Sequence, residues 1–108
     1  MNSLQETCGI EHTLTMMGGK WKPLILWFLG KYGVKRYGEI RRYIPSVSNK
    51  MLSQQLKELA SDCLITRHDY QTVPPKVEYA ITKEGQSLMP ILELMCTWGI
   101  DHEAICKK

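Results

Sequence analysis

The sequence has 108 residues, the size of one domain, and 44% of them are hydrophobic, which is enough for one modest core. No apolar run approaches the ~20 residues that a membrane span requires, and the start of the chain has no basic segment followed by an apolar one. We therefore expect one domain over residues 1–108 of a soluble, cytoplasmic protein that does not enter a membrane.

The net charge of +3 is concentrated in one part of the chain. Residues 20–50 contain eight lysines or arginines and one acid, whereas acids outnumber bases on both sides of this segment. Such a cluster is typical of a surface that binds phosphate groups, and it also fits a solvated basic face with no specific function.

Three helices are predicted in the first half of the chain. Residues 8–17 carry apolar side chains at i, i+4 and i+7, and Gly18-Gly19 ends that helix. Residues 24–32 are apolar on nearly every side, which predicts a helix at the centre of the core, and Pro23 suits its first position. Residues 37–43 predict a short third helix.

Residues 48–60 predict an amphipathic helix with two unlike faces. Leu52, Leu56 and Leu59 form an apolar stripe, and Ser48 is placed to cap the first turn. The opposite face carries two cations and two hydrogen-bonding side chains: Lys50, Ser53, Gln54 and Lys57. Two short helices joined by a break, the second with a cationic outer face, are typical of a helix-turn-helix DNA reader, although any solvated amphipathic helix shares this pattern.

A hairpin is predicted after this helix, formed by residues 64–70 and 76–82. The second stretch alternates apolar and polar side chains with period two, which indicates a strand with one buried face. The connecting loop is stiffened by Pro74-Pro75. A hairpin that directly follows a reading helix is a wing.

The C-terminal segment predicts a long helix over residues 83–104, in which Pro90 either introduces a kink or marks the start of the helix proper. A helix of that length would span about 33 Å, which is long for so small a domain. Its apolar stripe therefore predicts packing against the same helix of a second copy, helped by the N-terminal helix. An ordinary core-packing helix is the alternative.

Five motifs, in this order and spacing, resemble the HxlR-type winged-helix regulators, which are relatives of the MarR group. They are GGKWK (Gly18–Lys22), SNKMLSQQLKEL (Ser48–Leu59), LITR (Leu64–Arg67), VPPKVEY (Val73–Tyr79) and T-x-x-G (Thr82–Gly85). Together they span nearly the whole chain, so this resemblance is more specific than a lone helix-turn-helix.

The resemblance implies a mainly helical α+β fold, a winged helix-turn-helix with a two-stranded antiparallel wing and flanking dimerisation helices at about 8–17 and 83–105. It also implies a bacterial-type transcriptional regulator that binds a pseudo-palindromic operator on double-stranded DNA as a homodimer. In some members, a cysteine just before the first helix senses oxidants or electrophiles such as quinones, diamide or aldehydes. Cys8 occupies that position.

The predicted DNA contacts fall into two groups. Side chains that read bases or line the groove are Lys50, Ser53, Gln54 and Lys57, because lysine donates to guanine and glutamine pairs with adenine. Side chains that meet the sugar-phosphate backbone are Asn49, Lys35, Arg36, Arg41 and Arg42, with Lys76 near the wing tip as a backbone or minor-groove contact. Lys20 and Lys22 are weaker candidates because they flank the first two helices.

Cys8 is the candidate redox sensor. A thiol at a helix N-terminus feels the positive end of the helix dipole, which favours the thiolate, and His12 lies one turn further on. Cys96 and Cys106, on or just beyond the dimer helix, could pair with it across subunits, whereas Cys63 is predicted to fill the core. An unreactive thiol at a dimer interface is the alternative.

Two other function classes compete with DNA binding. Cys8 and His12 could form a nucleophile and base of a thiol enzyme, but no third orienting group accompanies them. A winged helix that binds proteins would not need the cations of residues 20–50. No metal or other cofactor is expected, because the cysteines form no C-x-x-C pair and His12, His68 and His102 share no spacing with carboxylates or thiols.

Overall fold

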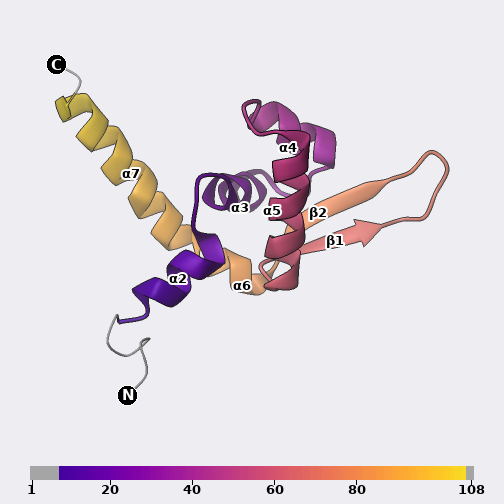
Figure 1. Cartoon of the computed structure of the whole chain (residues 1–108), viewed down its shortest axis with the longest axis horizontal. Coiled ribbons are helices and arrows are strands. Elements are labelled where there is room, and N and C mark those ends of the chain that lie inside the picture. The colour runs from indigo at the N-terminus through magenta and orange to yellow at the C-terminus, as the bar shows by residue number, and fades with distance from the viewer. Residues whose placement is uncertain (1–7, 107–108) are drawn as a thin grey trace.

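The computed structural model of the chain describes residues 8–106. Residues 1–7, on which the expectation about the start of the chain rests, lie outside the described part. The elements in order are α2 (Ile10–Met17), α3 (Trp21–Tyr32), α4 (Tyr37–Tyr43), α5 (Asn49–Ser61), β1 (Ile65–Asp69), β2 (Val77–Ile81), α6 (Lys83–Gln86) and α7 (Met89–Cys106). The predicted mainly helical α+β class with a two-stranded antiparallel wing is confirmed. The wing projects from one side of the molecule, while α2 and α7 project from the other (Figure 1).

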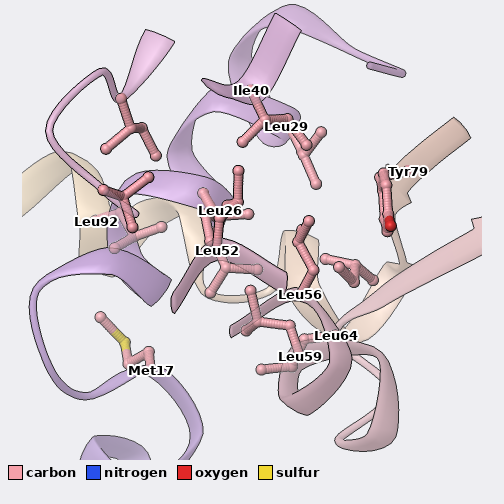
Figure 2. Packing of buried hydrophobic residues seen from close by; sticks show 14 residues of the cluster. Met17, Leu26, Leu29, Ile40, Leu52, Leu56, Leu59, Leu64, Tyr79 and Leu92 are labelled. Atoms are coloured by element: carbon pink, nitrogen blue, oxygen red, sulfur yellow. The ribbon is translucent and has the colours of Figure 1, made fainter. Parts of the chain in front are cut away.

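Helix α3 lies at the centre of the core, as its nearly all-apolar sequence predicts. Ile25, Leu26 and Leu29 are at most 1% exposed, and α3 contacts α4, α5, α6, α7 and β2. The leucine stripe of α5 packs onto it together with Ile40, as Figure 2 shows. This packing fixes the orientation of α5, because all three leucines of its stripe are at most 2% exposed.

The helix-turn-helix is formed by α4 and α5, and both helices have defined starts. The Glu39 carboxylate accepts a hydrogen bond from the Arg36 amide at 2.9 Å, which satisfies one free donor ahead of α4. The Ser48 hydroxyl accepts from the Met51 amide at 3.1 Å, which confirms the predicted cap of α5.

Cys63 is exposed, and the prediction that it fills the core is wrong. Helix α5 ends in a turn in which the Cys63 amide donates to the Ala60 carbonyl at 3.1 Å and the Leu64 amide donates to the Leu59 carbonyl at 3.0 Å. This turn requires the left-handed conformation at Cys63, whose φ is 63°. In this conformation the Cys63 side chain points to solvent, and the next residue, Leu64, is buried in the core.

The wing is a regular antiparallel pair in which Arg67 lies opposite Tyr79. Each strand is one residue shorter at both ends than its predicted range. A third segment pairs with the middle of β2, because Lys35 and Tyr79 exchange two backbone hydrogen bonds of 3.0 and 2.8 Å. The sequence did not predict this bridge, since a single paired residue leaves no periodic pattern.

The C-terminal segment consists of the short α6 and the long α7, so the continuous helix from Lys83 is not formed, and the alternative of a helix that begins at Pro90 is correct to within one residue. The chain breaks after the short α6, and Pro90 is the second residue of α7, where a missing amide costs little. Within α7, Leu92 is buried, whereas Leu94 and Trp98 are 72% and 66% exposed. Among residues 8–106, no helix is both long and apolar enough to cross a membrane.

Candidate nucleic-acid interface

The outer face of α5 is polar, cationic and open to solvent. Lys50, Ser53, Gln54 and Lys57 are all exposed, opposite the buried leucine stripe. Neither lysine forms an ion pair within residues 8–106. Gln54 is partly engaged, because its amide donates to the Glu58 carboxylate at 2.7 Å. The four predicted groove-facing side chains therefore share one surface.

The Glu58 carboxylate of α5 is paired with a nearly buried lysine of the core helix α3. Glu58, the one acid in this helix, forms an ion pair of 2.7 Å with Lys22 of α3, whose side chain is only 11% exposed. Hydrogen bonds from Gln54 and then from Lys22, with the charge of that ammonium, hold the pKa of Glu58 below its usual value. Lys22 thus joins α3 to α5, and its ammonium is not available for DNA.

The four predicted phosphate contacts around α4 have different surroundings. Arg36 and Arg42 are exposed and, in the described part of the chain, form no ion pair. The Arg41 guanidinium instead donates to the carbonyls of Pro45 and Val47, so it braces the turn between the two helices. Lys35 is half-buried, and its ammonium lies 5.6 Å from the centre of the Phe28 ring.

Asn49, the first residue of α5, is held by Tyr37 of α4. The Tyr37 hydroxyl donates to the Asn49 side-chain oxygen at 2.9 Å, and the Asn49 carbonyl lies 3.2 Å away. This bond leaves the amide NH₂ group of Asn49 available as a donor. Sequence reasoning missed Tyr37, because a tyrosine at the start of a short amphipathic helix has no feature that predicts a bond to the next helix.

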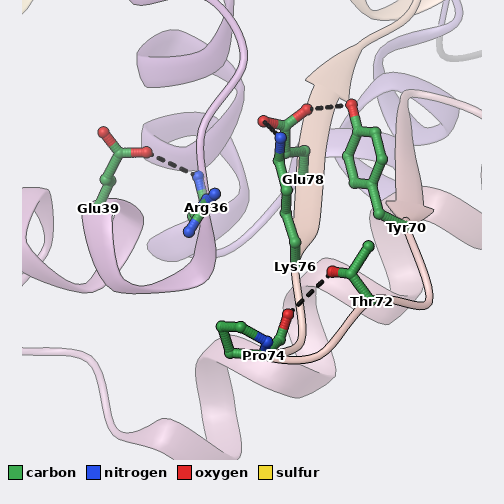
Figure 3. A network of polar contacts seen from close by, with 7 residues as sticks. All are labelled: Arg36, Glu39, Tyr70, Thr72, Pro74, Lys76 and Glu78. Carbon is green, nitrogen blue, oxygen red and sulfur yellow. Dashed lines mark hydrogen bonds and ion pairs between the residues drawn. The ribbon is translucent and has the colours of Figure 1, made fainter.

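Lys76 is held against the wing by two neighbours. Its ammonium lies 4.4 Å from the Tyr70 ring centre and 4.0 Å from the Glu78 carboxylate (Figure 3). The Tyr70 hydroxyl donates to the same carboxylate at 2.7 Å, and this hydrogen bond raises the pKa of Tyr70. The wing tip itself is apolar, since Val73 is 99% exposed.

Arg67 is a cation that the predicted contacts do not include. It lies on β1, and with Ser53 and Lys57 of α5 it lines a cavity of about 320 Å³ between helix and wing. Arg67 stands in the motif LITR, but the sequence alone does not show which face of the strand carries it. Its position next to α5 follows from the wing register, which only the structure supplies.

Cys8 is exposed and lies two residues ahead of α2, which begins at Ile10. The predicted start of this helix at Cys8 is wrong, because Cys8 and Gly9 have φ values of 55° and 82°. Cys8 borders a cavity of about 310 Å³ between α2 and α7, whose lining includes Leu14 and Met95. The thiol thus lies at the edge of the apolar surface of these two helices.

Cys96 and Cys106 are exposed along α7. The Cys106 sulfur lies 3.5 Å from the His102 ring, which stacks on Trp98 with ring centres 4.6 Å apart. The inference that no histidine shares a spacing with a thiol is therefore wrong for this pair, which is one helical turn apart. Over residues 8–106, no group of three or more His, Cys, Asp or Glu side chains could hold a metal ion.

Comparison with known proteins gives consistent matches over most of the chain. The model of the HxlR-like helix-turn-helix family matches residues 16–105. A Fusobacterium mortiferum protein named as a regulatory protein, MalR, is 61% identical over 95 residues, covering 88% of this chain and 90% of MalR. The HTH-type transcriptional regulator YkvN of Bacillus subtilis is 50% identical over 93 residues, covering 86% of this chain and 78% of YkvN. Among solved structures, the redox regulator HypR in its reduced form is 42% identical with a TM-score of 0.84, covering 89% of this chain and 94% of the HypR chain.

Proposed function

The chain belongs to the HxlR-like helix-turn-helix family, whose members are DNA-binding transcriptional regulators and not enzymes, and we propose that it binds a pseudo-palindromic operator as a homodimer. In this proposal α5 enters the major groove, the wing lies along the adjacent backbone or minor groove, and the protein works in the cytoplasm beside the DNA. The observation that carries the proposal is the outer face of α5, where Lys50 and Lys57 are exposed without an ion-pair partner among residues 8–106 and the Glu58 carboxylate is paired with Lys22.

The residues of α5 divide the work of recognition in this proposal. Lys50 and Gln54 donate to base edges, with Ser53 and Lys57 lining the groove. Asn49, held by Tyr37, donates its free NH₂ to a phosphate at the flank. The backbone contacts from outside α5 are Lys35, Arg36, Arg41, Arg42 and Lys76.

A homodimer explains the apolar surface of α2 and α7. Ile10 and Leu14 of α2 are 63% and 60% exposed, and Leu94, Trp98 and Ile100 of α7 are at least 63% exposed. So many large apolar side chains on two neighbouring helices are typical of a surface that a protein partner covers. A second copy that covers this surface would place the two α5 helices about 34–36 Å apart, so that they could enter successive major grooves on one side of the DNA.

Cys8 is the sensing residue of the proposal. Its thiol is exposed and borders the apolar surface of α2 and α7. The similar protein HypR is a redox regulator, which supports a redox role for this thiol. Oxidation would join the Cys8 sulfur to a cysteine sulfur of the second subunit, with Cys96 and Cys106 of α7 as candidates. The two thiols would lose two protons and two electrons, which diamide accepts as it becomes the hydrazine. The new bond would change the angle between the two reading helices.

A DNA-binding titration over a salt series tests the regulator itself. The reduced protein is titrated against the DNA upstream of its own gene and against random DNA of equal length. We expect tighter binding to the upstream DNA and a logarithm of affinity that falls linearly with the logarithm of salt, at about 0.9 per neutralised phosphate. Lys50→Glu should abolish the preference, whereas Lys83→Glu, at an exposed cation of α6, should keep it. Equal affinity for both DNAs, followed by a genome-wide fragment selection that enriches nothing, would refute the proposal.

The redox arm repeats the titration after diamide treatment. We expect altered affinity, a covalent dimer on a non-reducing gel, and loss of both effects in Cys8→Ser. Cys96→Ser and Cys106→Ser identify the second sulfur. If diamide changes neither affinity nor mobility, Cys8 is not an oxidant sensor, while the DNA-binding part of the proposal is unaffected.

A further inference from the structure

A cavity of about 320 Å³ separates the reading helix from the wing. Its polar lining comes from Ser53 and Lys57 of α5 and from Arg67 of β1, and its apolar lining comes from Leu56, Ala60 and Tyr79. A hydroxyl, an ammonium and a guanidinium from two different elements therefore border one space.

The fold determines this convergence. Ser53 and Lys57 are one helical turn apart, so both lie on the same side of α5. On β1, Arg67 shares a strand face with the buried Ile65 and pairs in register with the buried Tyr79, which turns it toward α5. The leucine stripe of α5 and the pairing of β1 with β2 thus keep the two cations on either side of the cavity.

The two cations that border the cavity have no ion-pair partner. Across residues 8–106, no ion pair engages Lys57 or Arg67. Glu58, next to Lys57 in sequence, pairs instead with Lys22, and Asp69 of β1 accepts from the Gln71 amide at 2.8 Å and forms no ion pair with Arg67. A hydroxyl and two unpaired cations around a cavity suit a single anion that accepts several hydrogen bonds.

We propose that this cavity binds one phosphodiester of the DNA strand that separates the major groove, occupied by α5, from the minor groove beside the wing. The inference rests on the proposed function, since it takes the DNA geometry from it. With a helix in one groove and a hairpin at the next, the strand between the grooves must pass between α5 and β1. Arg67 and Lys57 then clamp a phosphate, which fixes the register of α5, and Lys57 positions the protein instead of reading a base.

The test combines protein variants with single neutral methylphosphonates, placed one at a time along the operator. With the unmodified protein, one position per half-site should lower the affinity by about tenfold or more, the loss expected when a charge-assisted hydrogen bond is removed. Arg67→Ala should lose a similar factor on unmodified DNA and lose clearly less than the unmodified protein does at that same position, because only Lys57 then remains on the phosphate. For the Arg67→Ala dimer, the slope of log affinity against log salt should be smaller by about 2, because each subunit loses one cation that contacts a phosphate.

Two further variants make the result specific. Lys57→Ala, on the other side of the cavity, should be less sensitive to the same methylphosphonate and keep the base preference, while Lys83→Ala should behave as the unmodified protein. Arg67→Gln keeps most of the side-chain length, so its equal loss together with an unchanged melting temperature excludes a folding defect.

Three results would overturn the inference. Arg67→Ala could bind with full affinity, it could stay as sensitive to the methylphosphonate as the unmodified protein, or Lys57→Ala could change the preferred bases. In each case the unmodified protein still prefers its operator, so the proposed function survives. If the unmodified protein has no preferred DNA, both the proposed function and this inference fail.

Discussion

Individual side chains decide which charges the reading helix presents. The Glu58 carboxylate is paired with the nearly buried Lys22, and one guanidinium nitrogen of Arg41 is bonded to the carbonyls of the turn. The sequence predicted the outer face of α5 correctly, because a helical period places those residues opposite the leucines. It could not separate Lys22 from the surface cations or find Arg67, since both depend on which residues of other elements lie nearby.

The Lys22–Glu58 ion pair predicts unequal effects of removing either partner. Glu58→Ala leaves the nearly buried ammonium of Lys22 without a counter-charge, whereas Lys22→Met replaces that ammonium with an apolar group of similar size. The side chain of Glu58 is 39% exposed, so water can solvate the carboxylate that Lys22→Met leaves behind. Thermal unfolding should therefore show a larger fall in melting temperature for Glu58→Ala. The reverse order would mean that the ammonium reaches solvent.

Helix ends and close contacts determine how the elements meet. The sequence predicted α4, α5 and the wing because each has a period, a cap or a turn signal within its own residues. It did not predict the outward turn of Cys63 or the Lys35–Tyr79 bridge, and it left open whether the chain breaks before α7. Those features depend on how one element meets the next, and the local residue pattern carries little information about that.

Gly85 is the residue of α6 that packs closely against Leu64 and against Ile81 at the end of β2. A Cβ at this position would lie 2.2 Å from the Leu64 carbonyl oxygen and 2.6 Å from the Ile81 side chain. Gly85→Ala should therefore lower the free energy of unfolding by about 1–3 kcal/mol, the usual cost of overpacking a core. The matched control is Gly38→Ala in α4, where the Cβ would lie 3.8 Å from the Arg42 guanidinium and a small gain in stability is expected. Chemical denaturation measures both, and equal stabilities would contradict this account of α6.

The capping carboxylate of α4 makes part of the stability depend on pH. The hydrogen bond from the Arg36 amide, aided by the charges of Lys35, Arg42 and Arg36, holds the pKa of Glu39 below its usual 4.5. A group with a lowered pKa in the folded state stabilises the fold above its unfolded pKa, and that contribution is lost as the pH falls through the folded value.

Glu39→Gln cannot titrate, so it provides the comparison for this effect. The unmodified protein should be the more stable of the two at neutral pH, and the difference should begin to shrink near pH 4.5 and disappear once the pH is below the lowered pKa of the folded state. Urea unfolding at a series of pH values measures the difference. A difference that stays constant over that range would show that the charge of Glu39 does not support α4.

At the scale of the whole molecule, the apolar side chains of α2 and α7 are the feature that one chain leaves unexplained. The exposed fractions of Ile10, Leu94 and Trp98 are all above 60%. The sequence predicted a long apolar helix without enough chain to cover it, and the exposure of α7 agrees with that reasoning. The register of two copies could not be predicted, because one chain contains no information on how its partner is rotated.

A charge in the centre of this surface should separate the subunits. Leu94→Glu places a carboxylate where the proposed dimer is dry, so sedimentation should show a monomer with native helix content, and DNA affinity should fall because one reading helix is lost. Val34→Glu changes another exposed apolar residue, 53% exposed in the loop between α3 and α4, and should remain dimeric. A Leu94→Glu dimer would contradict the proposed interface.

The most direct test of DNA reading by α5 is a selection of bound sequences from random duplex DNA by the reduced protein. We predict enrichment of an inverted repeat whose half-site centres lie about 10 base pairs apart, or a multiple of that spacing. Gln54→Ala should relax one base position symmetrically in both half-sites and leave the rest of the motif intact. Enrichment of no motif, or of the same motif by a protein in which Lys50 and Gln54 are both alanine, would contradict the account.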